Sequence, residues 1–307
     1  MTQYLQLPDS AQPVEGSMFP GFQRARISTS GAEINLVVGG EGPPLLLLHG
    51  NPLMHVSWHK IAPWLAEEYT VVVPDLRGYG DSSKPEGGGN HAAYSFRAMA
   101  EDQVEVMAAL GFSHFEVAGH DRGGRVGHRL ALDYPDCVDK LAVLDIVPTH
   151  HLLTNISKGW ATESYHWFFM AQPAPFPERL LGADLEYYIR YKLAKKGVGL
   201  GPFTEEAMAE YIRCCTPENI HAVCEDYRAT LTIDFELDAA DYGKRFVECP
   251  LLVLWGENSH VGRHFSPLEA WQEWARDVTG VALASGHYPA EQCPEETYAA
   301  LHRFLRV

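Results

Sequence analysis

A glycine-flanked aspartate lies among the residues of this chain best suited to chemistry. Residues 119–125 read Gly-His-Asp-Arg-Gly-Gly-Arg, so Asp121 occupies the centre of a Gly-x-Asp-x-Gly pattern. The short, mostly apolar run 114–118 precedes this turn, and a helical pattern over 126–132 follows it. A strand, a tight glycine turn and a helix form the context of a nucleophile elbow, in which a strained turn presents one side chain at the edge of a sheet. The pattern therefore predicts that Asp121 is a nucleophile.

The identity of this residue decides which reaction is suitable. A serine elbow attacks carbonyl carbons, and no Gly-x-Ser-x-Gly turn occurs anywhere in the chain, which argues against a serine hydrolase. A carboxylate is better suited to attack a saturated carbon that carries a leaving group or belongs to a strained ring. The product is then an alkyl ester of the enzyme, which water must hydrolyse. The alternative is an aspartate in an ordinary turn, since Asp and Gly both favour turns.

His287 is the candidate general base. An aspartyl ester needs a base that activates water, and the base needs an orienting acid. His287 follows a glycine in the loop 284–289 near the carboxyl end of the chain. Asp145 is the preferred acid and Glu257 the alternative, because each follows an apolar run that reads as a strand. A role for Asp145 as the cap of a helix or turn also stays open.

Two backbone donors and two arginines complete the candidate site. The N–H groups of Arg122 and of Asn51, in the loop 49–52, are expected to stabilise an oxyanion at the Asp121 carboxyl. Arg122 and Arg125 are three residues apart on the expected helix and share one face of it. Two guanidiniums there would bind a substrate carboxylate. Alternatively, they are surface arginines or partners of Asp121.

The elements that must position these residues alternate between strands and helices. Residues 32–38 alternate as a half-buried strand should. Continuous apolar runs predict buried parallel strands at 44–48, 70–73, 115–118, 141–144 and 251–254, with helical patterns at 98–110 and 126–134. This alternation predicts an α/β fold, a mostly parallel sheet with helices on both faces.

The alternation stops near Pro148 and resumes near Pro250. The intervening segment is rich in His, Trp, Tyr and Phe and shows helical patterns without buried strands. Parallel sheets bind ligands at the carboxyl edge of their strands, where an insertion would form a lid. We therefore expect a core domain in two parts, 1–147 and 250–307, and an inserted helical cap at 148–249.

Composition limits the partners and the compartment. The formal net charge of −16 argues against nucleic acid and an anionic membrane surface as partners. An anionic substrate would need local positive charge. Six cysteines without a CxxC pair, and a first segment without an apolar core, indicate a cytoplasmic protein with reduced thiols. No cluster of ligand residues suggests a metal or an organic cofactor.

Together these motifs resemble the alpha/beta-hydrolase superfamily and, within it, the fluoroacetate dehalogenases. The elbow itself is shared with haloalkane dehalogenases and epoxide hydrolases, whereas an arginine in place of the tryptophan that usually follows Asp is far more discriminating. The resemblance covers most of the chain, including residues 49–59, 118–133, 140–149, 165–175, 224–229 and 285–287. One departure is Asn51, where other members carry an aromatic residue.

The resemblance implies a role for each matching residue. Asp121 is then the nucleophile, His287 the base and Asp145 its partner, with Arg122 and Arg125 on the substrate carboxylate. The halide site of the family falls on His166, Trp167 and Tyr227. These three side chains offer an imidazole N–H, an indole N–H and a phenol O–H. Fluoride is a poor leaving group, so donors aimed at the departing halogen would lower the barrier.

We therefore predict hydrolytic dehalogenation of haloacetates to glycolate and halide through an aspartyl ester, in a cofactor-free enzyme that family members suggest is a homodimer. An epoxide hydrolase is the nearest alternative, with Tyr165 and Tyr227 as proton donors, but it leaves Arg122 and Arg125 unexplained. A non-catalytic carboxylate-binding protein of the same fold is the second alternative. The preferred halide, the substrate size limit, the oligomeric state and the lid motion stay open.

Overall fold

A nine-stranded sheet forms the core of the protein in the computed structural model, which describes residues 3–306 except for the side chains of 195–198. The strand order is β1-β2-β3-β5-β4-β6-β7-β8-β9. Pairing is antiparallel from β1 to β5 and parallel from β5 to β9. The strands are β1 (Gln12–Pro13), β2 (Gln23–Ser28), β3 (Glu33–Gly39), β4 (Pro44–Leu48), β5 (Thr70–Pro74), β6 (Phe115–His120), β7 (Val138–Leu144), β8 (Leu251–Gly256) and β9 (Val278–Leu283).

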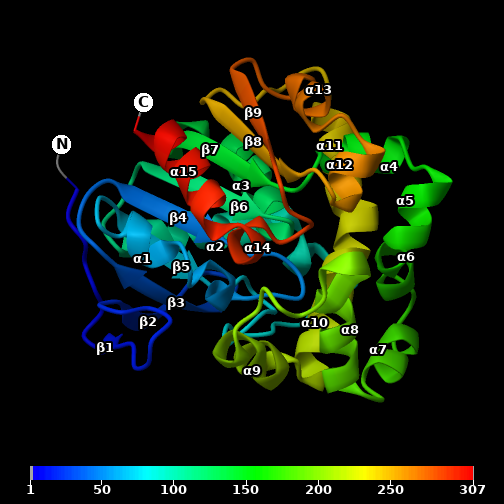
Figure 1. The fold of residues 1–307 in the computed structure, drawn as a ribbon, viewed down its shortest axis with the longest axis horizontal. Helices are drawn as coiled ribbons and strands as arrows, with labels where there is room; N and C mark the ends of the chain where they lie inside the picture. Colours follow the sequence, from blue (N-terminus) through cyan, green and yellow to red (C-terminus); the bar gives the residue numbers. More distant parts are fainter. Residues whose placement is uncertain (1–2, 307) are drawn as a thin grey trace.

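Helices cover both faces of this sheet. In Figure 1, α1 and α15 lie in front of it, and α2 and α3 lie behind. The helices are α1 (Ala62–Leu65), α2 (Phe96–Ala109), α3 (Arg122–Asp133), α4 (Thr149–Thr154), α5 (Lys158–Glu163), α6 (His166–Met170), α7 (Phe176–Leu181), α8 (Leu185–Val198), α9 (Glu205–Cys214), α10 (Pro217–Ala229), α11 (Phe235–Asp241), α12 (His260–His264), α13 (Pro267–Gln272), α14 (Pro289–Gln292) and α15 (Pro294–Leu305). This arrangement confirms the predicted fold class.

The inner strands are buried along almost their whole length. β4, β5 and β7 are rich in Leu and Val, as expected for strands that carry helices on both faces, and every residue of β6 is buried. The prediction that 32–38 is half-buried was wrong, because β3 is buried from Ile34 to Gly39. Its polar Asn35 does not face solvent but donates a hydrogen bond to Asp75 at 2.8 Å. A polar residue in an alternating pattern can therefore be buried when another buried side chain accepts its hydrogen bond, as Asp75 does for Asn35.

Helices α4 to α11 lie between β7 and β8 in the chain, and Figure 1 shows α5, α6, α7, α8 and α10 on one side of the sheet. Local sequence explains why several begin where they do. Ser157, Asp184, Thr204 and Thr216 each accept a hydrogen bond from the N–H three residues on, as N-cap residues do. Within residues 3–306, no helix combines the length and the apolar character that crossing a bilayer requires.

A buried histidine in α3 makes stability depend on pH. The ring of His128 lies edge-on to Trp271 and Trp274, with centroids 5.0 and 4.9 Å away. Burial, followed by the positive charges of Arg129 and Arg125, holds the pKa of His128 well below 6.5. The folded protein keeps this imidazole neutral, whereas the unfolded chain binds a proton below pH 6.5. Its stabilising contribution is therefore complete above that pH and is lost as the pH falls.

We expect His128→Leu to remove one proton from this dependence. On the acid side of pH 6.5, as the unfolded imidazole becomes fully protonated, the slope of the unfolding free energy against pH should decrease by up to about 1.4 kcal/mol per pH unit. Urea unfolding of both proteins at a series of pH values measures the two slopes. Identical slopes would contradict a neutral buried imidazole at this position.

Candidate active site

Asp121 occupies a strained turn between β6 and α3. Its backbone angles are φ 48° and ψ −114°, in the positive-φ region that side chains other than glycine rarely adopt. The flanking glycines make the turn possible because a Cβ on Gly119 would lie 2.3 Å from the carbonyl oxygen of Gly123. A Cβ on Gly123 would lie 2.4 Å from the Leu48 oxygen. The turn therefore requires small residues and leaves the Asp121 side chain at the carboxyl edge of the sheet.

The surroundings of Asp121 keep its carboxyl group ionised. The Asn51 N–H donates a hydrogen bond to Asp121 Oδ2 at 2.9 Å. Burial alone would raise the pKa of Asp121, but the nearby His287, Arg122 and other basic groups hold it well below its ordinary value. Arg122 is the first residue of α3, so its backbone N–H has no acceptor inside the helix. Both N–H groups expected to stabilise an oxyanion thus belong to the loop and helix next to Asp121.

His287 and Asp145 lie together beside Asp121. His287 Nδ1 and Asp145 Oδ2 are 2.6 Å apart, while Asp145 Oδ1 accepts the Gly256 N–H at 3.0 Å. Asp145 directly follows β7 and also has a positive φ of 53°. Glu257, the alternative acid, is exposed. The carboxylate at Nδ1 aligns the ring so that Nε2 is the nitrogen for proton transfer, as in other acid–histidine pairs.

The two arginines are buried rather than superficial. Arg122 Nη1 donates to the Thr230 hydroxyl at 2.7 Å, and its Nε lies 3.4 Å from Asp226 Oδ2. Arg125 Nη1 donates to the Val147 carbonyl and to a threonine hydroxyl, both at 3.0 Å. Among the described residues, nothing accepts a hydrogen bond from Arg122 Nη2 or from Arg125 Nε, although both atoms are buried. Leaving a buried donor without an acceptor costs free energy. These two N–H groups are therefore suited to donate hydrogen bonds to a bound ligand.

Both guanidiniums remain charged near neutral pH. Burial lowers the pKa of Arg125 to about 10, partly offset by the negative charge of Asp121. For Arg122, burial also lowers the pKa and is the largest single effect, but the negative charge of Asp226 together with smaller contributions from neighbouring acidic groups outweighs it and raises the pKa. An anion next to Asp121 would therefore meet two fixed positive charges.

The three residues assigned to the halide site by resemblance lie around these arginines. The Arg122 guanidinium lies 3.7 Å from the ring centroid of Tyr227 and 5.0 Å from that of Trp167. Arg125 lies 4.8 Å from the Trp167 ring, and the His166 and Tyr227 rings are 5.7 Å apart. Burial raises the pKa of Tyr227, so its phenol keeps its proton. All three side chains are buried and come from α6 and α10 of the inserted segment.

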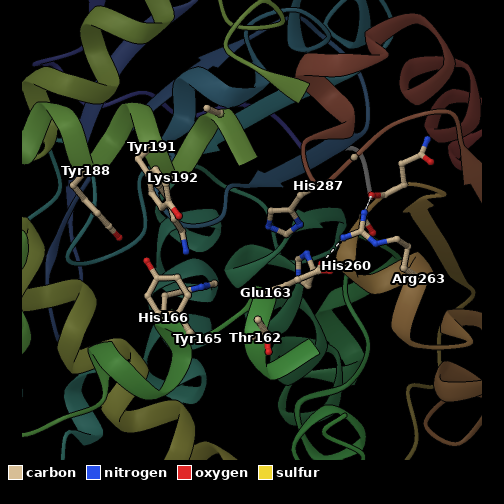
Figure 2. Close-up of a pocket in the computed structure, with 14 residues that line it drawn as sticks. Thr162, Glu163, Tyr165, His166, Tyr188, Tyr191, Lys192, His260, Arg263 and His287 are labelled. Carbon is tan, nitrogen blue, oxygen red and sulfur yellow. Dashed lines mark hydrogen bonds and ion pairs between the residues drawn. The ribbon is translucent and has the colours of Figure 1, made fainter. Parts of the chain in front are cut away.

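A cavity of about 340 Å³ adjoins this site (Figure 2). His166 and His287 line it together with Tyr188, Lys192 and His260. Figure 2 shows these side chains surrounding one space, with Tyr188 and Lys192 coming from α8. The cavity therefore lies between His287 and the helices of the inserted segment.

Sequence reasoning missed the residues that hold Arg122. Asp226 and Thr230 are one turn apart, and Tyr79 donates to Asp226 Oδ2 at 2.6 Å. The available signal was the position of Asp226 directly before Tyr227 in α10, with Thr230 four residues later on the same face. Polar residues four positions apart are common in helices, so this spacing did not identify Arg122 as their partner.

Among the residues that the structure describes, two groups of side chains have possible ligand atoms within 4.8 Å of one another, as metal ligands do. The first is Asp145, His260 and His287, in which the hydrogen bond between base and acid already uses two members. In the second, Asp81 and Glu210 both form ion pairs with Arg213 and lie near a cysteine. Contacts within the protein therefore already engage two of the three members of each group.

Known proteins resemble this chain along most of its length. Residues 43–292 match the sequence model of the alpha/beta hydrolase fold. The chain is 47% identical to a fluoroacetate dehalogenase from Burkholderia sp, over 94% of this chain and 95% of that protein. It is 35% identical to a soluble epoxide hydrolase from Corynebacterium sp. (strain C12), over 87% of this chain and 91% of that protein. A crystal structure from Nostoc sp PCC 7120, provisionally described as an alpha/beta hydrolase, shares 54% identity at a TM-score of 0.92, covering 94% of this chain and 99% of that one.

Proposed function

The chain belongs to the alpha/beta hydrolase family and is a hydrolase, and we propose that it converts haloacetates to glycolate and halide. The observation that best supports this proposal is the pair of buried guanidiniums of Arg122 and Arg125 next to Asp121, with donors that nothing in the described residues satisfies. A carboxylate bound there would lie beside an ionised nucleophile. The similarity to the Burkholderia fluoroacetate dehalogenase points to the same substrate class.

In the first step, Asp121 attacks the carbon that bears the halogen. A new bond forms between the Asp121 carboxylate oxygen and this carbon while the carbon–halogen bond breaks and the halide leaves with the electron pair. The arginines hold the substrate carboxylate, which keeps the carbon in line for backside attack. His166, Trp167 and Tyr227 donate hydrogen bonds to the departing halide.

In the second step, His287 removes a proton from water, which attacks the carboxyl carbon of the ester. Asp145 stabilises the imidazolium that forms, and the N–H groups of Asn51 and Arg122 stabilise the oxyanion. As this intermediate collapses, the imidazolium of His287 returns its proton to the departing alkoxide oxygen, which releases glycolate, and the Asp121 carboxyl group loses the remaining proton to water and is again a carboxylate. We propose that the cycle needs no metal or organic cofactor. We also propose that the enzyme is a cytoplasmic homodimer, and light scattering would measure the mass of the assembly.

An epoxide hydrolase is the second candidate, favoured by the Corynebacterium relative. It would share Asp121 and His287, with two tyrosines that protonate the opening ring. Tyr227 is buried in the site, whereas Tyr165 is about half exposed. A neutral epoxide also offers no countercharge to Arg122 and Arg125. Dehalogenation therefore accounts for more of the structure.

Ion-selective electrodes test the proposal by measuring halide release from fluoroacetate and chloroacetate. We expect release of both halides by the native chain and none by Asp121→Asn, because an amide is a very weak nucleophile toward saturated carbon. Styrene oxide serves as the comparison substrate. Diol formation without halide release would overturn the proposal in favour of an epoxide hydrolase, and ligand-induced stabilisation without turnover would favour a binding protein.

A further inference from the structure

Asn51 contacts two residues of the site through different groups. Its backbone N–H donates to Asp121 Oδ2 at 2.9 Å, a contact that almost any residue in this position could make. Its side-chain Nδ2 donates to the Tyr227 hydroxyl oxygen at 3.1 Å, which requires a carboxamide or a similar donor. Asn51 and Tyr227 are only 2% and 1% exposed, so bulk water does not compete for this hydrogen bond. The roles of Asn51 derived from the sequence use only its backbone.

The side-chain contact constrains where the phenol hydrogen points. A phenol hydrogen prefers the plane of its ring, where it has two positions, and the Asn51 amide occupies the side of the oxygen that it approaches. The hydrogen is therefore directed to the other side. Burial keeps the pKa of Tyr227 well above its ordinary value, so the hydrogen is present at neutral pH. A donor to the phenol oxygen also polarises the O–H bond and strengthens the hydrogen bond that it donates.

The other neighbours of Tyr227 pack against its ring, whereas Asn51 contacts its hydroxyl group. Arg122 lies over the ring, 3.7 Å from its centroid, and therefore approaches the face of the phenol. The His166 and Trp167 rings pack at 82° and 77° to it, with centroids 5.7 Å away. Among the described hydrogen bonds, the amide of Asn51 is the one made to the Tyr227 hydroxyl.

We propose that the Asn51 carboxamide is a positioning residue that aims the Tyr227 hydroxyl at the leaving halide and so determines the preference for fluoride over chloride. This inference rests on the proposed dehalogenation. Fluoride is the stronger hydrogen-bond acceptor and the poorer leaving group, so its departure gains most from an oriented donor. Chloride leaves more readily and accepts weaker hydrogen bonds, so the same donor matters less to it. Asn51 thereby couples the nucleophile, through its backbone, to the leaving-group donor, through its side chain.

Asn51→Ala tests the side chain and keeps the backbone donor. We expect kcat for fluoroacetate to fall by about 10-fold to 100-fold, with kcat for chloroacetate within about threefold of the native value and KM little changed. Tyr227→Phe should show the same selective loss. The double variant should be no slower than Tyr227→Phe alone, because both substitutions remove one function.

Asn219→Ala is the matched control. Asn219 is a buried asparagine on α10, the helix that carries Tyr227, and donates to the Gly78 carbonyl at 2.8 Å; the described hydrogen bonds include none between Asn219 and Tyr227. Its loss should affect both halides equally. An equal loss on both substrates in Asn51→Ala, or independent multiplication of the losses in the double variant, would overturn the positioning role and leave Asn51 as a structural residue.

Halide binding provides a readout that does not depend on turnover. Trp167 lies in the site, so its fluorescence is expected to report binding of sodium fluoride or sodium chloride to the free enzyme. We expect Asn51→Ala to weaken fluoride binding by about tenfold, because the Tyr227 hydroxyl is no longer held toward the halide, and to change chloride binding little. A native chain that binds fluoride but releases none from fluoroacetate would refute the proposed function alone. Unchanged fluoride affinity in Asn51→Ala would refute the inference alone.

Discussion

His287→Asn is expected to stop the reaction at the covalent ester and to lower steady-state turnover by about 10⁴-fold or more. Asparagine cannot accept the proton that water must lose, whereas the first step needs no base. His287 Nδ1 lies 2.6 Å from Asp145 Oδ2, so the native ring is held in one orientation for this proton transfer. The variant should therefore consume one equivalent of haloacetate and then stall.

Intact-mass spectrometry detects this ester as an added carboxymethyl group, and peptide mapping locates it on Asp121. Asp121→Asn serves as the control that forms no adduct. Steady turnover by His287→Asn without an accumulated ester would show that another group is the base. A burst of halide without any covalent adduct would instead argue against the ester itself.

Arg125→Met is expected to lower kcat/KM for haloacetates by about 10²-fold to 10³-fold, the effect of losing one buried, charge-assisted carboxylate contact. Methionine keeps much of the side-chain volume and removes the charge. Arg125 suits this test better than Arg122, because removal of Arg122 would leave the buried Asp226 carboxylate without its counter-ion. Arg125→Lys should recover part of the loss, since an ammonium keeps the charge without the planar geometry.

Two comparisons separate a local contact from general effects of charge and folding. Arg190→Met removes an exposed arginine that pairs with Glu186 on α8, and it should leave kcat/KM nearly unchanged. Chloroacetamide has the halogen but no carboxylate, so Arg125→Met should affect it far less than chloroacetate. An equally large loss with chloroacetamide would show that Arg125 supports the structure of the site rather than the substrate.

Local patterns were sufficient to predict the central strands of the sheet and the elbow, whereas β1, β2 and β9 were not predicted. The strands β4 to β8 are short, mostly apolar runs that alternate with helices along the chain. They were recognisable because parallel strands that are covered on both faces contain few polar residues. The elbow was recognisable because the turn at Asp121 admits only glycine at its closest approaches, including Gly119 and Gly123. Both features depend on steric constraints that act on neighbouring residues, so they are visible in the local sequence.

Contacts between distant segments were not predictable in this way. The hydrogen bond from Asn51 to Tyr227 joins residues 176 positions apart, and the ion pair of Arg122 with Asp226 joins a core helix to α10. Nothing in either local sequence specifies the other. The burial of β3 was misjudged for the same reason, since Asn35 finds its partner in Asp75, beyond its own strand.

A single turnover in water enriched in ¹⁸O tests the central claim, attack by the Asp121 carboxylate on carbon, most directly. With enzyme in excess over fluoroacetate, the oxygen that joins glycolate comes from Asp121, and the heavy oxygen of water enters the carboxylate. The account predicts unlabelled glycolate after the first turnover and a heavy Asp121 peptide by mass spectrometry. Labelled glycolate with an unlabelled Asp121 would contradict it, because water would then have displaced the halide directly.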